Sequence, residues 1–198
     1  MRPNIIIDLD DTLIDSALVK RVLFDAALEA GFSYSTILRA YKTTKEKGFS
    51  PKKFAQALNK NRSAELTKNL ETALENIPSV TFPGVKEFLC TIAVKTNIIF
   101  LTFGDSGYQR LKAKKAGLKK FAKRIVVTKE TDKKKRLKTL ARGSPQSIYF
   151  IDDNRHALRN AKDIGIKTVQ IKKGFKNKSY FSTLTTRIEK LMKLDSEQ

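Results

Sequence analysis

An acidic cluster directly after a short apolar run is the sequence feature that most constrains this fold. The run Ile5-Ile6-Ile7 is β-branched and predicts a strand buried on both faces. The segment Asp8-Leu9-Asp10-Asp11-Thr12-Leu13 follows it without a break. Burying like charges this close together is costly without a cation or a proton. Since open parallel sheets bind ligands at the carboxyl ends of their strands, the cluster predicts a functional site. An Asp-rich turn that caps the next helix is the alternative.

Five apolar, β-branched runs recur along the chain, and helical patterns separate most of them. This alternation is typical of a parallel sheet in an α/β domain. We therefore predict a Rossmann-like, three-layer α/β/α core. The predicted strands are Asn4–Ile7, Asn97–Leu101, Arg124–Val127, Ser147–Ile151 and Lys167–Ile171.

The long interval between the first two predicted strands has no strand pattern. Apolar residues recur there at helical spacing, and Ser50-Pro51 supplies a cap residue and a first-turn proline. The predicted helices are Ser16–Ala30, Ser35–Glu46, Lys52–Asn59 and one from Ser63 to about Ile77. We thus predict an α/β core of residues 1–14 and 80–198, interrupted by an all-helical insertion of residues 15–79.

Composition excludes several classes of function. The chain has 198 residues and no window of about 18 uninterrupted apolar residues, so we expect no contact with membranes. The N-terminus lacks a signal-peptide pattern, and we expect a cytoplasmic monomer. His156 is the only histidine, which argues against Ser–His or Cys–His nucleophiles. Cys90, the only cysteine, lies in the apolar stretch Phe88-Leu89-Cys90 and is expected to be a core thiol. Catalysis must then use carboxylates, lysines or a metal.

The formal charge of +20 is unevenly distributed. Residues 110–142 hold fifteen Lys and Arg against two acidic residues, whereas residues 14–82 hold eleven basic and seven acidic residues. A basic stripe of this kind is the electrostatic footprint of an anionic partner such as a nucleic acid. Solvated helix faces are the alternative, and Phe121 is the only aromatic residue in the stripe that would stack on a base.

Polar residues also follow the later strands. Thr102 and then Phe103 come after the run ending at Leu101, and Asp152-Asp153 come after the run ending at Ile151. Between them, Lys133 begins a predicted helix whose inward face carries Leu137 and Leu140.

In this order and spacing, these residues resemble the four motifs of the haloacid dehalogenase superfamily over nearly the whole chain. The first motif matches Asp8, Asp10 and Thr12, the second Thr102, the third Lys133, and the paired-acid version of the fourth Asp152-Asp153. The resemblance implies the strand order 5-4-1-2-3, with Asp8 and Asp153 on adjacent strands. It also implies that the helical insertion is a C1-type cap.

The resemblance implies an Mg²⁺ ion held by Asp8, the main-chain oxygen of Asp10 and one acid of the Asp152-Asp153 pair. We favour Asp153, because Asp152 occupies a place that is often Gly in the family. Oxygen-only ligands also make Mg²⁺ the natural ion.

The same resemblance assigns the catalytic roles. Asp8 is the candidate nucleophile, because a carboxylate can form an aspartyl-phosphate. Asp10 is the candidate acid and base, with a side chain on the same side as that of Asp8. Thr102, its neighbour Phe103 and Lys133 are expected to hold the phosphoryl group. Lys129, Lys134 and Lys135 remain alternatives to Lys133.

Asp at the position of Asp10 favours phosphate-ester hydrolysis or phosphomutase chemistry, since the family's dehalogenases lack an Asp there. We therefore predict a Mg²⁺-dependent phosphatase of a small phosphorylated substrate. The alternatives are a phosphatase of nucleotides or nucleic-acid ends, and a nucleic-acid-binding protein on the same scaffold. The sequence leaves open the substrate and whether Tyr34, Arg39, Tyr41 and Lys42 face the pocket.

Overall fold

The computed structural model describes residues 2–130, 133–142, 148–172 and 177–196. Five parallel strands form one sheet in the order β3-β2-β1-β4-β5, which confirms the predicted order. The strands are β1 (Asn4–Ile7), β2 (Asn97–Phe103), β3 (Ala122–Thr128), β4 (Ile148–Asp152) and β5 (Lys167–Gln170). Ser147, predicted to begin the fourth strand, lies outside the described residues.

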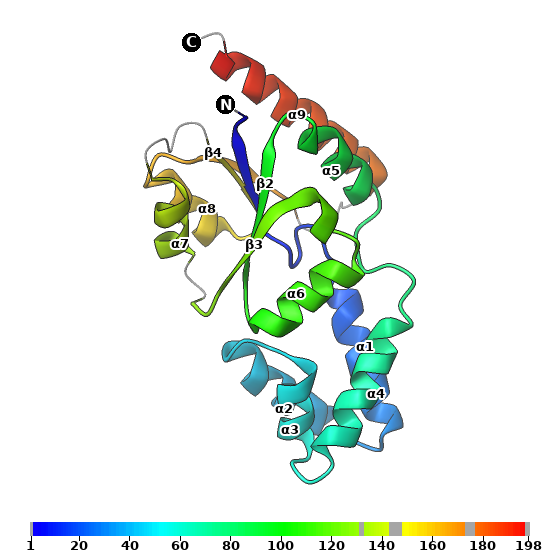
Figure 1. Cartoon of the computed structure of the whole chain (residues 1–198). Helices are drawn as coiled ribbons and strands as arrows, with labels where there is room; N and C mark the ends of the chain where they lie inside the picture. Colours follow the sequence, from blue (N-terminus) through cyan, green and yellow to red (C-terminus); the bar gives the residue numbers. More distant parts are fainter. Residues whose placement is uncertain (1, 131–132, 143–147, 173–176, 197–198) are drawn as a thin grey trace.

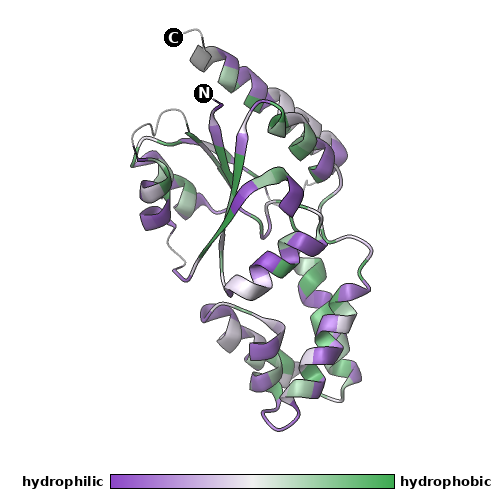
Figure 2. Cartoon of the chain, viewed as in Figure 1, coloured by the Kyte–Doolittle hydropathy of each residue, from purple (hydrophilic) through white to green (hydrophobic). Residues whose placement is uncertain are grey.

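Helices cover both faces of the sheet and make the predicted three layers (Figure 1). Alternate residues of β1 point to opposite faces, so Ile5 and Ile7 pack in one core cluster and Ile6 packs in the other. α7 (Lys134–Leu140) and α8 (Arg155–Lys162) cover the face of Ile6. The other face is covered by α5 (Val85–Ala93), α6 (Ser106–Lys115) and α9 (Lys178–Ser196), with a 3-10 turn, η1 (Lys119–Phe121), before β3. Figure 2 shows the strands between them as the apolar centre.

Four helices lie between β1 and α5 in the chain, where the sequence predicts an all-helical insertion. They are α1 (Ser16–Glu29), α2 (Tyr34–Glu46), α3 (Pro51–Leu58) and α4 (Ser63–Glu75). Asp15, Ser33 and Ser50 accept hydrogen bonds from main-chain N–H groups at the starts of the first three. The four helices pack on one another around Phe24, Ile37 and Phe54 and lie beyond one end of the sheet (Figure 1). No helix in the described part of the chain is long and apolar enough to cross a membrane.

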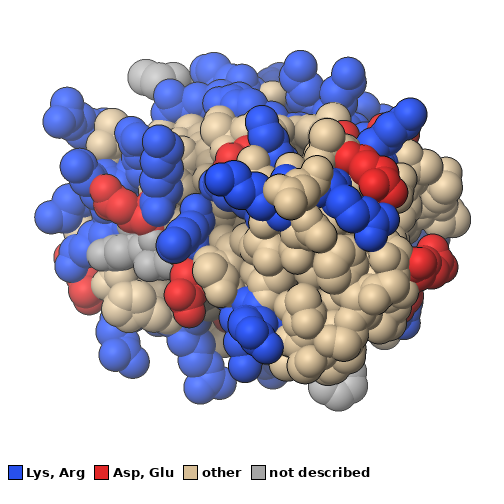
Figure 3. Space-filling view, turned by 90° about the horizontal axis from the view of Figure 1, so that it is seen from below, with Lys and Arg blue, Asp and Glu red and all other residues tan. Residues whose placement is uncertain are grey.

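The basic residues of 110–142 do not share one face of the molecule. Ala113 of α6 and Ala116 directly after it belong to one core cluster, whereas Leu137 of α7 and Ala141 directly after it belong to the other. The segment therefore wraps around the edge strand β3, with α6 over one face of the sheet and α7 over the opposite face. In Figure 3, Lys and Arg side chains are spread over much of the visible surface.

Cys90 is exposed, so the prediction of a core thiol is wrong. It lies on α5, whose buried residues are Val85, Phe88, Leu89 and Ile92. Their spacing of three, one and three positions defines a single helical stripe, and Cys90 falls outside it. The apolar neighbours in the sequence gave no indication of this, because adjacent helix positions point about a quarter-turn apart.

This stripe makes a testable prediction from two adjacent residues. Leu89→Ala removes a fully buried side chain and is expected to lower the free energy of unfolding by about 2–5 kcal/mol. Cys90→Ser, one position on, is expected to leave it nearly unchanged, because the side chain is already in water. Urea denaturation of both variants tests the stripe, and equal losses would contradict it.

Candidate active site

The carboxyl ends of β1, β2 and β4 bring the predicted site residues to one edge of the sheet. Asp8 follows β1 directly, Thr102 lies near the end of β2, and Asp152 ends β4. The Asp8 N–H donates to the Ile151 carbonyl oxygen at 2.9 Å, which extends the pairing of β1 with β4 by one residue. The Asp153 N–H donates to the buried Thr12 hydroxyl at 3.2 Å. These two hydrogen bonds hold the segment after β1 against the end of β4 and the residue that follows it.

Three carboxylates converge at this edge. Asp8, Asp152 and Asp153 each offer an oxygen, and these oxygens lie within 4.8 Å of one another, so the expected closeness of Asp8 and Asp153 is confirmed. Lys133 Nζ lies 2.5 Å from Asp8 Oδ1 and 2.8 Å from Asp152 Oδ2, with all three side chains buried. Of the four candidate lysines, Lys133 is therefore the one that reaches the cluster. Lys129 and Lys135 are exposed, and Lys134 pairs with Asp163 at 3.8 Å.

The single positive charge of Lys133 does not balance the negative charges of the three carboxylates. Burial raises the pKa of the Asp8 carboxyl to about 8; Lys133 acts against this rise, and the charges of Asp152 and Asp10 add to it. A carboxylate that is to stay ionised here at neutral pH needs a further cation nearby. A hard divalent cation fits the donor set, because every donor in the group is a carboxylate oxygen.

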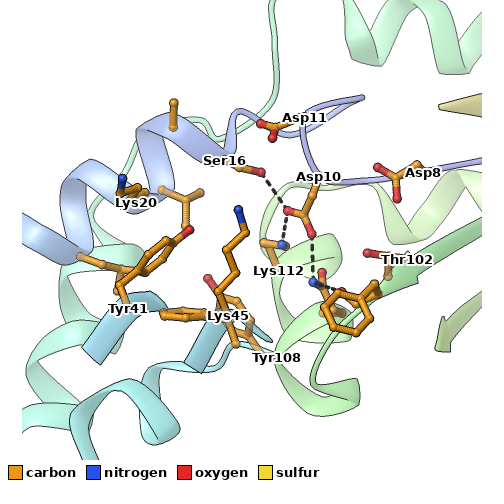
Figure 4. Close-up of a pocket in the computed structure, with 16 residues that line it drawn as sticks. Asp8, Asp10, Asp11, Ser16, Lys20, Tyr41, Lys45, Thr102, Tyr108 and Lys112 are labelled. Atoms are coloured by element: carbon orange, nitrogen blue, oxygen red, sulfur yellow. Dashed lines mark hydrogen bonds and ion pairs between the residues drawn. The ribbon is translucent and has the colours of Figure 1, made fainter. Parts of the chain in front are cut away.

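Asp10 lies in a different environment from Asp8. Its Oδ1 pairs with the ammonium group of the buried Lys112 and accepts a hydrogen bond from the Ser16 hydroxyl at 3.1 Å. Its Oδ2 accepts a bond from Gln109 Nε2 at 2.9 Å. Burial alone would raise the pKa of Asp10, but Lys112, Gln109 and Ser16 outweigh burial and lower it. The two acids of the first motif therefore have opposite pKa shifts. Figure 4 shows the contacts that surround Asp10.

The Thr102 hydroxyl is fully buried and has no hydrogen-bond partner among the described residues. In Figure 4 it lies on the same side of the cavity as Asp8. Phe103 also lines the cavity, and its carbonyl oxygen accepts a hydrogen bond from Gln109 Nε2 at 2.8 Å. An unpartnered buried hydroxyl is costly, and this one lies in a residue that lines the cavity.

A cavity of about 330 Å³ lies between this edge and the helices α1 and α2. Its lining includes Asp8, Asp10 and Thr102 on the side of the sheet and Lys20 and Tyr41 on the side of the inserted helices. Tyr41 therefore faces the pocket. Tyr34, Arg39 and Lys42 are exposed and are not part of the lining.

The loop after α2 lies directly against the loop after β2. A Cβ added to Gly48, at φ +80°, would lie 3.1 Å from the Gly104 carbonyl carbon. Lys53 Nζ lies 3.4 Å from Asp105 Oδ2, and the rings of Phe49 and Tyr108 are 5.7 Å apart. The inserted helices thus contact the core on the rim of the cavity.

Sequence reasoning missed Lys112 and Gln109. Lys112 belongs to the basic segment 110–142, where nothing in the pattern separates it from exposed lysines. Its position three residues after Gln109 places both on one face of α6, and that face is turned toward Asp10. The available signal was the helical spacing of two polar residues shortly after Thr102.

A sequence profile of the haloacid dehalogenase-like hydrolases matches residues 5–171. The chain therefore belongs to the haloacid dehalogenase-like hydrolase family and is a hydrolase of that class. A search of curated protein sequences finds no match.

Many solved structures share the fold. A haloacid dehalogenase-like family hydrolase from Xanthomonas campestris has a TM-score of 0.71 and 18% identity, covering 100% of this chain and 95% of its own. The HAD-hydrolase YfnB from Bacillus subtilis, bound to magnesium, has a TM-score of 0.60 and 16% identity, covering 86% of each chain. L-2-haloacid dehalogenase from Xanthobacter autotrophicus has a TM-score of 0.60 and 14% identity, covering 86% of this chain and 78% of its own. At these identities the likeness establishes the fold.

The raised pKa of Asp8 makes a prediction for the metal-free protein. Its folded pKa of about 8 lies above the ordinary value of 3.8. This difference stabilises the folded protein at pH values below the ordinary pKa. The stabilisation is lost as pH rises through about 8. Asp8→Asn cannot ionise, so its free energy of unfolding should rise relative to wild type between about pH 5 and pH 8.5. Urea denaturation in chelator at both pH values measures this. The exposed Asp25→Asn is the control, and a constant Asp8→Asn difference would contradict the assignment.

Proposed function

We propose that the protein is a Mg²⁺-dependent phosphatase that hydrolyses a small phosphomonoester through an aspartyl-phosphate on Asp8. The unpartnered buried Thr102 hydroxyl in the same cavity as Asp8 carries this proposal. A phosphoryl oxygen is the acceptor that this hydroxyl lacks. Lys133, paired with Asp8 at 2.5 Å, supplies a fixed positive charge beside the position proposed for the phosphoryl group.

Asp10 supports a phosphatase rather than a dehalogenase. The resemblance implies that dehalogenases of this family have no Asp two residues after the nucleophile. Phosphate-ester hydrolysis needs a proton donor for the leaving oxygen and a base for water. Asp10 lines the cavity, and about a third of its side chain is exposed there, so one group can serve both steps.

Asp8, Asp153 and the main-chain oxygen of Asp10 are the proposed ligands of Mg²⁺. Asp152 is less suited, because Lys133 engages its Oδ2 and the Asn154 N–H donates to its Oδ1 at 2.8 Å. When bound, the ion would offset the negative charge that Asp8 and the phosphoryl group bring together. Its affinity should rise with pH up to about 8, since Mg²⁺ and a proton compete for Asp8.

The chain's own side chains account for both chemical steps. An Asp8 oxygen attacks phosphorus as the ester P–O bond breaks, and the leaving oxygen takes a proton from Asp10. A water molecule then attacks the phosphorus, Asp10 takes the proton of that water, and the bond to Asp8 breaks to release phosphate. Lys112, Gln109 and Ser16 favour ionised Asp10, which is the form that the second step requires. The first step uses the protonated form of Asp10, which the same contacts disfavour.

The helices α1–α4 are the proposed cap, within residues 15–79. They provide one wall of the cavity, and their loop after α2 contacts the core at Gly104. Closing such a wall over the substrate excludes water from the reacting phosphoryl group. A cavity of about 330 Å³ suits a small substrate better than a nucleic-acid duplex.

The direct test is phosphate release from a panel of phosphomonoesters with Mg²⁺ or with chelator. We expect turnover of at least one small phosphomonoester that depends on Mg²⁺. Halide release from 2-haloacids is the matched assay for the dehalogenase reaction. Halide release without phosphate release would overturn the proposal.

Replacing Asp8 tests the covalent step. Asp8→Asn removes the nucleophile and its charge but hardly changes volume, so kcat should fall by at least about a thousandfold while the fold is kept. Circular dichroism checks folding, and Asp25→Asn on the exposed side of α1 is the control. Retention of a tenth of wild-type activity by Asp8→Asn would rule out the aspartyl-phosphate.

Replacing Lys112 tests how Asp10 is held. Lys112→Met removes the main charge that lowers the pKa of Asp10, so the acid limb of the pH profile of kcat should move to higher pH. Lys114→Met, two residues on and exposed, should leave the profile in place. An unchanged acid limb in Lys112→Met would show that Lys112 does not control Asp10.

A further inference from the structure

The wall of the cavity opposite Thr102 is built by residues that no catalytic step uses. Tyr41 and Lys45 lie four residues apart on α2 and therefore share one face of that helix. Both line the cavity, and in Figure 4 the side chain of Lys45, an exposed residue, extends toward it from the same helix as Tyr41. Phe49 and Tyr108 complete this wall, with ring centroids 5.7 Å apart.

The charges in the cavity leave Lys45 without a counterion. Asp8 is paired with Lys133, and Asp10 is paired with Lys112. No carboxylate of the described residues lies within ion-pair distance of Lys45. Asp11 is the other acid of the lining. Lys20 lies over the rings of Phe24 and Tyr41, at 4.9 and 5.2 Å from their centroids, and adds to the positive charge of this wall.

Tyr41 is a hydrogen-bond donor at this position. Burial, followed by the charges of Asp10 and Asp11, raises the pKa of its hydroxyl, so the proton stays on oxygen throughout the neutral range. An ammonium group and a phenol O–H on one face of a helix, at the same cavity, can together bind an anion. This site lies across the cavity from Thr102 (Figure 4), where the phosphoryl group is proposed to bind.

We propose that the substrate carries a second anionic group, which binds Lys45 and Tyr41 while its phosphoryl group lies at Asp8 and Thr102. The inference rests on the proposed phosphatase function and narrows its substrate to small phosphomonoesters with a carboxylate or a second phosphate. The carbon skeleton between the two anions lies against Phe49 and Tyr108. Lys45 and Tyr41 then determine specificity and take no part in bond breaking.

The experiment compares matched substrates. Alkyl phosphates of increasing chain length that end in a carboxylate or a second phosphate are assayed beside the same phosphates ending in a hydroxyl. We expect wild type to prefer an anionic member over its neutral partner in kcat/KM by at least about tenfold, about 1.4 kcal/mol. The chain length at the optimum reports the distance between the two anion sites, and the carboxylate and phosphate series identify the second anion.

Substitutions on α2 test which residues cause the preference for anionic substrates. Lys45→Gln should remove it by lowering kcat/KM for the anionic substrate, mainly through KM, while the neutral partner is unaffected. Lys45→Arg should retain it. Lys42→Gln is the control, because Lys42 is exposed on α2, as Lys45 is, but does not line the cavity. Tyr41→Phe should weaken the preference without abolishing it.

The outcomes separate the two proposals. No turnover of any phosphomonoester by wild type would overturn the phosphatase function itself. Turnover without a preference for the anionic partner, or an equal loss on both partners in Lys45→Gln, would overturn the second anion site alone. A preference for neutral aryl phosphates would also overturn it, and would indicate that Phe49 and Tyr108 bind an aromatic ring of the substrate.

Discussion

The ion pairs of Lys133 with Asp8 and Asp152 are the interaction on which the site depends. All three side chains are buried, at most 7% exposed, and removing such charges from water is expensive unless they are closely paired. The pairing requires that β1 and β4 be neighbours and that the start of α7 lie across their ends. The sheet order and the position of one helix are therefore conditions for the chemistry, because a different strand order would leave buried carboxylates without a counterion.

Two aspartates separated by a single residue have opposite pKa shifts. Asp8 lies at the strand end among other acids, and burial raises its pKa. Asp10 lies past the strand end, where Lys112, Gln109 and Ser16 surround it and lower its pKa. Pairs of acids whose environments separate their pKa values are typical of sites in which each acid has its own role. Here the separation arises from the burial of Asp8 and from contacts of Asp10, chiefly with α6, a helix about a hundred residues further along the chain.

The inserted helices give the site its second wall. They leave the core directly after the acidic loop, so α1 begins beside Asp10, and Ser16 at its first position donates to that carboxylate. Phe24 and Phe54 stack on each other within these helices, both belong to the same buried cluster as Ile5 and Ile7 of β1, and the loop after α2 packs against Gly104. A wall supported in this way places Tyr41 and Lys45 opposite the strand ends without contributing to the sheet.

Local patterns in the sequence were enough to predict the fold class, the strands and the four inserted helices. Runs such as Ile5–Ile7 and capping pairs such as Ser50-Pro51 specify structure through neighbouring residues alone. The edge that carries Asp8, Thr102 and Asp152 could be predicted for the same reason, since parallel strands end together. Which positions of a helix are buried was harder to predict from the sequence. On α5, Leu89 is buried whereas Cys90, the next residue, is exposed to solvent.

The order and spacing of the motifs indicated Lys133, but the tertiary structure alone decided that Lys112 belongs to the site. In the sequence, both are among fifteen basic residues within 33 positions, and nothing local separates Lys112 from Lys114. They are buried because α6 and the start of α7 lie against carboxylates from distant strands. The Thr102 hydroxyl, buried without a partner among the described residues, has the same origin. Whether a buried polar group has a partner depends on side chains from distant segments of the chain. The order of residues alone does not specify which segments these are.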